Sequence, residues 1–346
     1  MKKIVLTLVS IVAFFGLTEA QNSVSLSAVT IESSGTATLN IDVANAVEFT
    51  AFALTLNLPD GITIAEALNE DDELAPEVAL TTRKKSDHTL SVNASNGKMA
   101  SFSATNKLFR DQSGTLVTVT LKASASFKGG LVSVTEAYIT DVTGTDYPMA
   151  DALSAASVEG KVTVPFTMTS AGWGTLIIPF DHNVPDGLTA YTCSSFTTTA
   201  GVNWLTLVKA SSLSANTPYI LAGTTGNYNF SGTPNVTNTT YKEGLLTGVY
   251  APTTIGEGSV LQNQDGEVAF YSVAASDPKA VPAYRCYLNS SAPSGSVAFR
   301  LGGTTGIEEL TENESDGVLY DLQGRSVCGP LKNGVYIRNG KMILVK

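Results

Sequence analysis

Residues 49–61, FTAFALTLNLPDG, decide the fold class of this chain. Apolar residues alternate with small or polar ones from Ala51 to Leu58, and Pro59-Asp60-Gly61 then supplies turn residues. Because successive side chains of a strand point to opposite faces, this alternation is typical of a strand with one buried face. The preceding segment Thr36–Val43 alternates in the same way and predicts another strand.

The same pattern recurs on both sides of this stretch, in short segments separated by Gly, Pro, Asn and Asp. Eight or nine such segments predict an all-β fold with a β-sandwich over residues 22–163. We expect the acidic stretch Glu66–Glu77 to form a helical turn or a long loop. The other predicted strands are Ser23–Thr30, Leu90–Asn93, Met99–Thr105, Thr115–Ala123, Leu131–Thr135, Tyr138–Val142 and Val158–Val164.

Three blocks of this region resemble cellulosomal cohesin modules. They are AFALTLNLPDGI at residues 51–62, SGTLVTVTLKAS at 113–124 and VSVTEAYITDVTG at 132–144. The resemblance implies a nine-stranded, jelly-roll-like sandwich that presents strand faces or loops to a partner. It does not by itself make that partner a dockerin.

Residues 165–301 predict a second all-β domain, a sandwich or a barrel, and of these two we expect a second β-sandwich. Its blocks GWGTLIIPFD, NTPYILAG, LLTGVY, VLQNQDGEVAFY and VPAYRCYL resemble a β domain that recurs in exported multidomain proteins of Bacteroidetes. No general activity follows from that resemblance.

The first 20 residues have the pattern of a secretory signal peptide. Lys2 and Lys3 precede the apolar run Ile4–Leu17, and Ala20 is the expected cleavage site. The run is shorter than the roughly 20 residues that span a bilayer. We therefore expect an exported protein, extracellular or on the outer cell surface, with no transmembrane segment after cleavage.

The segment 303–316 reads as a linker and 317–346 as a small C-terminal β-meander. This tail resembles the sorting domain of type IX secretion cargo in Bacteroidetes, which implies the type IX machinery as a partner in export. The matching residues are Tyr320, Asp321, Gly324, Arg325, Gly334–Ile337 and Lys341–Lys346.

Composition narrows the classes of function. With 43% hydrophobic and 15% charged residues, the 346-residue chain is not intrinsically disordered. A net charge of −10 and the absence of a basic block make nucleic acid an unexpected partner.

Catalytic motifs are scarce, and we expect no enzymatic activity. His88 and His182 are the only histidines, and no Gly-x-Ser-x-Gly or His-Glu-x-x-His motif occurs. His88 lies in the polar stretch KKSDHTL and is expected on the solvated surface. A secreted hydrolase is the least favoured alternative, with His182 as its candidate base.

Four adjacent carboxylates, Glu70, Asp71, Asp72 and Glu73, form the densest acidic cluster. Two alternatives remain open for it: a solvated loop, or a structural calcium site built from carboxylate oxygens. No other cofactor is expected.

Large aromatic residues offer a binding surface, since their faces stack on sugar rings. The candidates of the second domain are weighed against ordinary core filling, and they are Trp173, Trp204, Tyr219, Tyr250 and Tyr284. Phe49, Phe52, Phe102 and Phe127 of the first domain are expected in the core.

Cys193, Cys286 and Cys328 would enter an oxidising compartment. Cys193 and Cys286 have similar strand-like contexts, so they either form a disulfide or remain free thiols, and spacing alone does not decide.

These observations favour a secreted or cell-surface adhesion or scaffold protein that binds a protein or glycan. The alternative is a carbohydrate-binding accessory protein for polysaccharide use.

Overall fold

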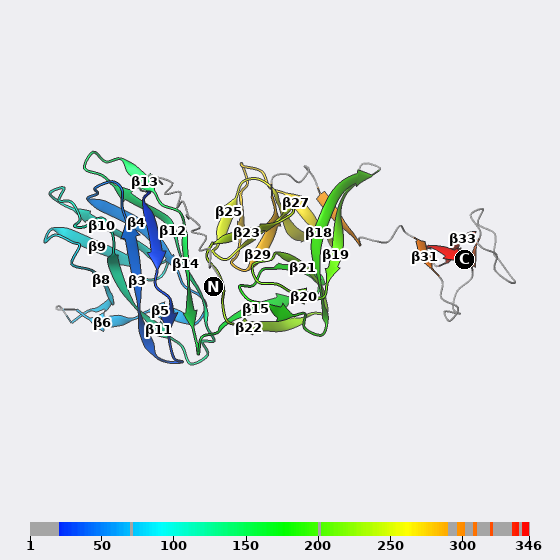
Figure 1. Cartoon of the computed structure of the whole chain (residues 1–346), viewed down its shortest axis with the longest axis horizontal. Coiled ribbons are helices and arrows are strands. Elements are labelled where there is room, and N and C mark those ends of the chain that lie inside the picture. Colours follow the sequence, from blue (N-terminus) through cyan, green and yellow to red (C-terminus); the bar gives the residue numbers. More distant parts are fainter. Residues whose placement is uncertain are drawn as a thin grey trace, which may run out of the picture. The chain divides into compact units, whose positions relative to one another are not determined.

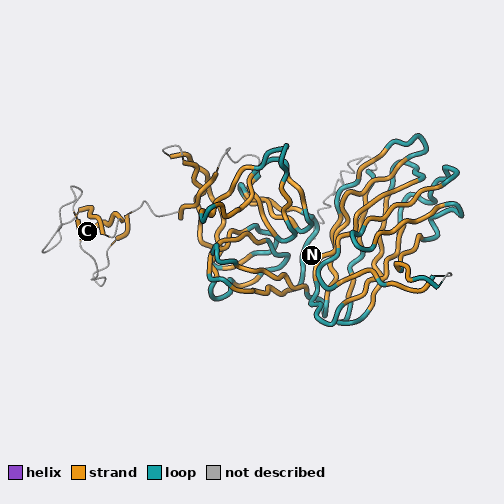
Figure 2. Tube along the Cα trace, turned by 180° about the vertical axis from the view of Figure 1, so that it is seen from behind, coloured by secondary structure: helices purple, strands orange, loops and turns teal. Residues whose placement is uncertain are grey.

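The computed structural model describes residues 21–69, 72–199, 202–289, 296–301, 307–309, 319–320, 334–338 and 341–345. All regular elements in these ranges are strands, which confirms the all-β fold class (Figures 1 and 2). The chain divides into two compact units, with the main boundary between Thr163 and Val164. Residues 1–20, expected to be a signal peptide, lie outside the described residues, and so do Glu70, Asp71 and Cys328.

The first unit is built from two main sheets. One has the order β1 (Ser23–Leu26), β3 (Thr36–Ala44), β11 (Thr115–Ala123) and β5 (Ile62–Ile64), with β8 (Val78–Leu80) also paired to β11. The other has the order β2 (Val29–Thr30), β14 (Ala152–Ser157), β12 (Gly130–Thr140), β4 (Ala51–Asn57), β10 (Lys98–Ser103) and β9 (His88–Asn93), with β13 (Asp146–Pro148) beside β12.

The segment at the start of the first unit joins both sheets. β1 pairs antiparallel with β3, whereas β2 pairs parallel with β14, the last strand of this sandwich. The Ile31 amide donates to the Ser157 carbonyl at 3.0 Å and extends the parallel pairing. The second strand of the sandwich, β2, is therefore anchored on its last one, β14.

Alternation along the strands fills the core between the two sheets. Leu54 and Leu56 of β4 are buried, and so are Leu39, Ile41 and Val43 of β3. Full burial of one such side chain contributes about 1.5–3 kcal/mol. The expected burial of Phe49, Phe52 and Phe127 is confirmed.

Phe102 is a correction to the sequence analysis, because its side chain is 55% exposed. Met99, Ser101 and Ser103 of the same strand are buried, so the pleat of β10 directs Phe102 to the outer face.

The acidic stretch is also a correction, because it forms neither a helical turn nor a long loop. β6 (Glu66–Leu68) and β7 (Leu74–Pro76) form an antiparallel hairpin. The Asn69 side chain accepts a hydrogen bond from the Glu73 amide at 2.9 Å and closes the connection.

A buried arginine holds the first unit together at one end. Arg83 is 3% exposed. Its guanidinium donates five hydrogen bonds, to the carbonyls of Val43, Arg110, Asp111 and Gly114 and to the Asn45 side-chain oxygen, at 2.7–3.0 Å. This group thereby ties the end of β3 to the loop that leads into β11.

The second unit is organised around one ten-stranded sheet. Its order is β16 (Trp173–Leu176), β21 (Tyr219–Gly223), β18 (Leu188–Thr199), β19 (Val202–Ala210), β30 (Ser296–Leu301), β27 (Glu267–Ser272), β26 (Ser259–Gln264), β29 (Arg285–Leu288), β24 (Leu246–Val249) and β23 (Thr240–Glu243). Figure 1 shows β18 and β19 as a long hairpin at one side of this unit. Three two-stranded sheets complete it: β15 (Val162–Met168) with β22 (Gly226–Gly232), β17 (His182–Asn183) with β20 (Ser212–Leu213), and β25 (Thr253–Ile255) with β28 (Lys279–Val281).

This large sheet curls so that its first strand meets β29. The Thr175 hydroxyl accepts from the Cys286 amide at 2.9 Å and donates to the Cys286 carbonyl at 3.2 Å. The Ile177 amide donates to the Tyr284 carbonyl at 3.2 Å. A Cβ on Gly248 would lie 2.6 Å from the Ile177 side chain, so the close approach of these strands requires glycine there. Of the two architectures expected, the unit is closer to a barrel.

The described part of the tail forms a small sheet. Its order is β31 (Ile307–Glu309), β34 (Lys341–Val345), β33 (Gly334–Arg338) and β32 (Leu319–Tyr320). β31 comes from the segment expected as a linker and pairs parallel with β34.

Candidate functional site

The outer face of the sheet β12-β4-β10-β9 carries two exposed aromatic rings, Phe102 of β10 and Tyr138 of β12, which are 55% and 37% exposed. Phe102 pairs with Ala51 of β4, and Tyr138 pairs with Ala53 of the same strand. Only alanine side chains of β4 therefore separate the two rings. A flat floor of small side chains leaves both rings available to a partner.

A β-bulge in β12 directs Tyr138 to this face. The register against β4 shifts between Thr135 and Tyr138. Glu136 adopts a φ of 53°, in the left-handed region that residues other than glycine rarely occupy. Without the extra residue, the pleat would direct Tyr138 into the core, since it is three residues from the outward Thr135. The Glu136 carboxylate accepts a hydrogen bond from the Thr55 hydroxyl at 3.0 Å and lies 3.9 Å from the Lys98 ammonium.

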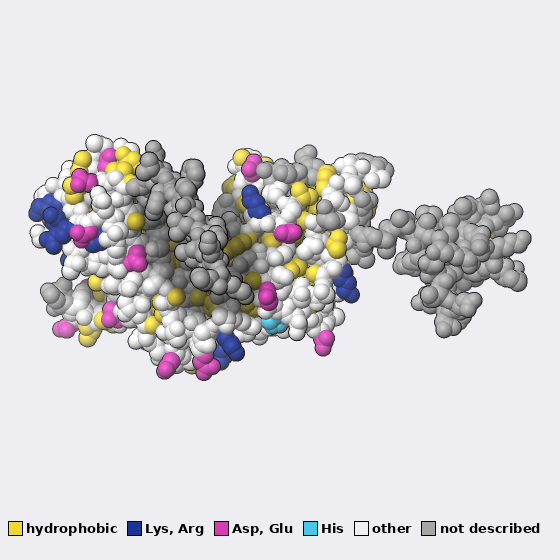
Figure 3. Space-filling view, in the orientation of Figure 1, with side chains coloured by type: hydrophobic (Ala, Val, Ile, Leu, Met, Phe, Trp, Pro, Cys, Tyr) yellow, Lys and Arg dark blue, Asp and Glu magenta, His cyan; other side chains and the backbone are white. Residues whose placement is uncertain are grey.

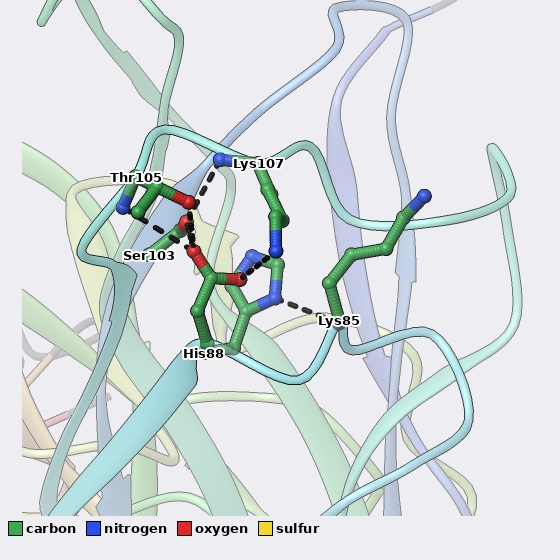
Figure 4. A network of polar contacts seen from close by, with 6 residues as sticks. Lys85, His88, Ser103, Thr105 and Lys107 are labelled. Atoms are coloured by element: carbon green, nitrogen blue, oxygen red, sulfur yellow. Dashed lines mark hydrogen bonds and ion pairs between the residues drawn. The ribbon is translucent and has the colours of Figure 1, made fainter.

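Figure 4 shows a polar network at one end of this sheet. Asp87 accepts hydrogen bonds from the Ser103 hydroxyl at 2.6 Å and from the hydroxyl and amide of Thr105, and its other oxygen lies 3.8 Å from the Lys107 ammonium. The hydrogen bonds from Ser103 and Thr105 hold the pKa of the Asp87 carboxyl well below its usual range. These contacts fasten the loop after β10 to the start of β9.

His88 is a third correction, because it is not on the solvated surface. It is 7% exposed, and its ring lies 3.8 Å from the Phe109 ring, centre to centre. Nδ1 accepts from the Lys85 amide at 2.8 Å, as Figure 4 shows. Burial lowers the pKa of this imidazole. Ser103 donates to Asp87 and not to His88, so the cluster does not have the order of a Ser-His-Asp triad.

His182 is half-buried beside Phe230, with ring centres 5.3 Å apart. Its Nδ1 lies 2.6 Å from the Asn183 carbonyl oxygen. The preceding Asp181 accepts a hydrogen bond from the Ala215 amide at 2.8 Å. Both side chains thus hold local backbone structure.

The second unit contains a cavity of about 420 Å³. Phe166 of β15 and Trp173 of β16 line it, together with Val260–Asn263 of β26 and Ala280–Pro282. Arg285, at the start of β29, also lines it and is the sole charged residue of the lining. The signal in the sequence was the single Arg within the apolar run VPAYRCYL, and the sequence analysis did not single it out.

The aromatic candidates of the second unit have different environments. Trp173 lines the cavity, and its ring lies 4.8 Å from that of Phe299. Trp204 is half-buried on β19, and Tyr284 is half-buried next to Arg285. Tyr219 and Tyr250 are buried, as the core-filling alternative expects, and the Tyr250 hydroxyl donates to the Asn216 side chain at 2.8 Å.

The disulfide alternative for Cys193 and Cys286 is wrong, since both are free and buried. They face different neighbours: Cys193 lies beside Gly244, while the backbone of Cys286 is bonded to Thr175. Burial raises the pKa of both thiols, that of Cys286 to about 12.

The calcium alternative stays a prediction. Asp72 and Glu73 follow the described hairpin strand β6, whereas Glu70 and Asp71 are outside the described residues. Across the part of the chain that the structure describes, no three His, Cys, Asp or Glu side chains converge as metal ligands. Within the same residues, no helix is long and apolar enough to cross a membrane.

The surface has few charges for its size. In the view of Figure 3, some Lys and Arg side chains gather at the left edge of the first unit, and the other charged side chains are scattered among uncharged ones.

Comparisons with known proteins returned cohesins among the solved structures. No family model matches the chain, and no curated protein does. A non-cellulosomal cohesin from the archaeon Archaeoglobus fulgidus is 12% identical over 40% of this chain and 94% of its own, with a TM-score of 0.32. A type II cohesin from the cellulosome of Acetivibrio cellulolyticus is 11% identical over 40% and 96%, with a TM-score of 0.32. A chain of a type I cohesin–dockerin complex from Clostridium thermocellum is 10% identical over 40% and 94%, with a TM-score of 0.31.

Proposed function

We propose that this chain is an exported, non-catalytic binding protein whose first unit docks a protein partner on the outer face of β12-β4-β10-β9. The observation that carries the proposal is the pair of exposed rings, Phe102 and Tyr138, on a floor of alanines. Exposed aromatic residues on an even surface are typical of interfaces, where they supply most of the binding energy.

The size of the face supports a folded protein as the partner. Four strands about 4.8 Å apart and about six residues long cover roughly 20 by 20 Å. A standard interface takes about 800 Å² from each partner, so the neighbouring loops contribute as well. One such loop, the turn after β12, carries the exposed apolar side chain of Val142.

The shape of the bulge supports the same proposal. Glu136 holds a backbone conformation that costs of order 1–3 kcal/mol for a residue other than glycine. Its effect is to place an apolar ring in water, which does nothing for the stability of the unit alone. A partner that covers Tyr138 gives this arrangement a function.

Export and attachment belong to the proposal. The pattern of residues 1–20 supports secretion, and the tail 317–346 supports recognition by type IX machinery and an extracellular or outer-surface location. Deletion of 317–346 should leave the two units folded and change where the protein accumulates. An unchanged distribution between medium, cell surface and periplasm would remove the tail from the proposal.

The docking face is tested with a double variant and a matched control. The immobilised chain is incubated with envelope extract of the producing cells, and retained proteins are quantified by mass spectrometry. Proteins retained by the wild type should be lost from Phe102→Ala/Tyr138→Ala and kept by Leu74→Ala, which truncates an exposed apolar residue of the β6–β7 hairpin. Because the contact is mainly apolar, retention should persist in high salt.

Equal retention by the double variant and the control would overturn the docking face. Hydrogen exchange gives the second readout: the purified partner should slow exchange at the edges of β4 and β10. A retained glycan in place of a protein would favour the carbohydrate-binding function.

A further inference from the structure

We propose that the cavity of the second unit binds a small carboxylate ligand, a uronic acid, with Arg285 pairing the carboxylate. This inference is independent of the docking face, which lies in the other unit. It rests on the small number of hydrogen-bond partners of Arg285 and on the residues that line the cavity around it.

Arg285 has few protein partners for its donors. Its guanidinium carbon lies 4.9 Å from the centre of the Phe166 ring. The guanidinium donates one hydrogen bond among the described residues, to the carbonyl of its neighbour Tyr284, at a long 3.5 Å. Among the described residues no carboxylate forms an ion pair with it. Arg83 shows the contrasting case, with all five donors used inside the protein.

The surroundings of Arg285 favour an incoming anion. Burial removes water from the guanidinium and lowers its pKa, and no carboxylate opposes this effect. A half-buried cation with open donors is stabilised by a bidentate carboxylate, which matches the planar fork of arginine. A single cation neutralises a monoanion, whereas a phosphate dianion would keep an uncompensated charge among apolar walls.

The walls select the rest of the ligand. Val260, Leu261 and Val281 supply apolar surface, and Trp173 supplies an aromatic face of the kind that stacks on sugar rings. Thr169, Gln262 and Asn263 line the same cavity, and their side chains can bond hydroxyl groups. A volume of about 420 Å³ is within the range of small-molecule pockets. A carboxylate on a hydroxylated six-membered ring fits all three features.

Calorimetric titration of the full mature chain tests the site. Glucuronate and galacturonate are the probes; glucose and galactose are their neutral counterparts, and benzoate is the carboxylate without hydroxyls. At least one uronic acid should bind at least tenfold more tightly than its neutral sugar and than benzoate. Arg285→Gln should reduce that affinity at least tenfold, and Lys242→Gln, an exposed cation of β23 outside the cavity, should not change it.

Each contrary result identifies what is wrong. Equal affinity for the neutral sugar would overturn the role of Arg285, and equal affinity for benzoate would overturn the sugar ring. No binding of either uronic acid would overturn the site. Should Arg285→Gln fail to fold, Asn263→Ala, at an exposed position that lines the cavity, carries the test: its affinity for the uronic acid should fall, and an unchanged affinity would overturn the cavity as the binding site.

Discussion

Replacement of Arg83 should destabilise the first unit strongly. In Arg83→Met, four carbonyls and the Asn45 amide oxygen lose the hydrogen bonds that the guanidinium donates, and the new side chain is shorter and uncharged. A hydrogen bond to a charged group contributes about 1.5–3 kcal/mol, but water reaches part of the vacated site, so the sum of five overestimates the loss. Disruption of a buried charged network costs about 3–5 kcal/mol, and we expect a loss in that range.

Arg83→Lys separates charge from hydrogen-bond geometry. An ammonium has three donors and no planar fork, so it cannot reach all five acceptors. We expect this variant to lose about 2 kcal/mol or more, between the wild type and Arg83→Met.

The two units of the chain permit an internal control. Both tryptophans, Trp173 and Trp204, belong to the second unit, so tryptophan fluorescence during urea unfolding follows that unit. Its transition should not move in either Arg83 variant. The calorimetric transition of the first unit should fall by roughly 6–20 °C for Arg83→Met, at about 2–4 °C per kcal/mol. A loss of unfolding free energy below about 1 kcal/mol in Arg83→Met, or equal stability of Arg83→Lys and wild type, would refute the stabilising role of the Arg83 hydrogen bonds.

Three further predictions concern single residues. Cys193 and Cys286 should resist alkylation at pH 8 in the native chain and react on unfolding, because burial raises the pKa of both thiols. Peptide mass spectrometry measures the alkylation of each cysteine, and rapid labelling of Cys286 in the native chain would contradict the prediction. The pKa of His88 in the folded chain lies below its unfolded value of about 6.5, so its contribution to stability is present above pH 6.5 and is lost as the pH falls toward the folded pKa. His88→Gln should therefore reduce the fall in unfolding free energy between pH 7 and pH 5. An unchanged pH dependence would count against this role of His88. Gly97→Ala should destabilise the β9–β10 connection by more than 1 kcal/mol in urea unfolding, since its φ is 68° and a Cβ there would lie 1.9 Å from the Leu56 carbonyl oxygen; a neutral effect would mean that the turn relaxes.

The strands of the first unit were predictable because they have one buried face. Thr115–Ala123 forms β11 with the predicted bounds, and Thr36–Val43 forms all but the last residue of β3. The alternation along β10 was also enough to place Phe102 correctly. Phe102 lies three residues from the buried Met99 and therefore on the opposite face of the sheet. Phe102 was expected in the core because its ring is apolar, whereas the period-two alternation of the strand would have placed it on the outer face.

The sites depend on contacts between distant segments, which local sequence does not show. His88 has polar neighbours in the chain, yet Phe109, brought over it by the loop after β10, buries its ring. Arg285 meets Phe166 and Trp173 only because the large sheet curls until β16 reaches β29. Tyr138 needed a bulge, and a bulge has no reliable pattern in a single sequence.

The parallel pairing of β2 with β14 has a mechanical consequence. Tension that pulls the start of the first unit away from its end would draw these neighbouring parallel strands in opposite directions along their own axes. The pairings of Val29 with Ala156 and of Thr30 with Ser157, and the hydrogen bond from Ile31, would then be loaded together in shear and not unzipped one at a time. The first unit should therefore resist tension between its two ends more strongly than a unit whose terminal strands are peeled off one hydrogen bond at a time.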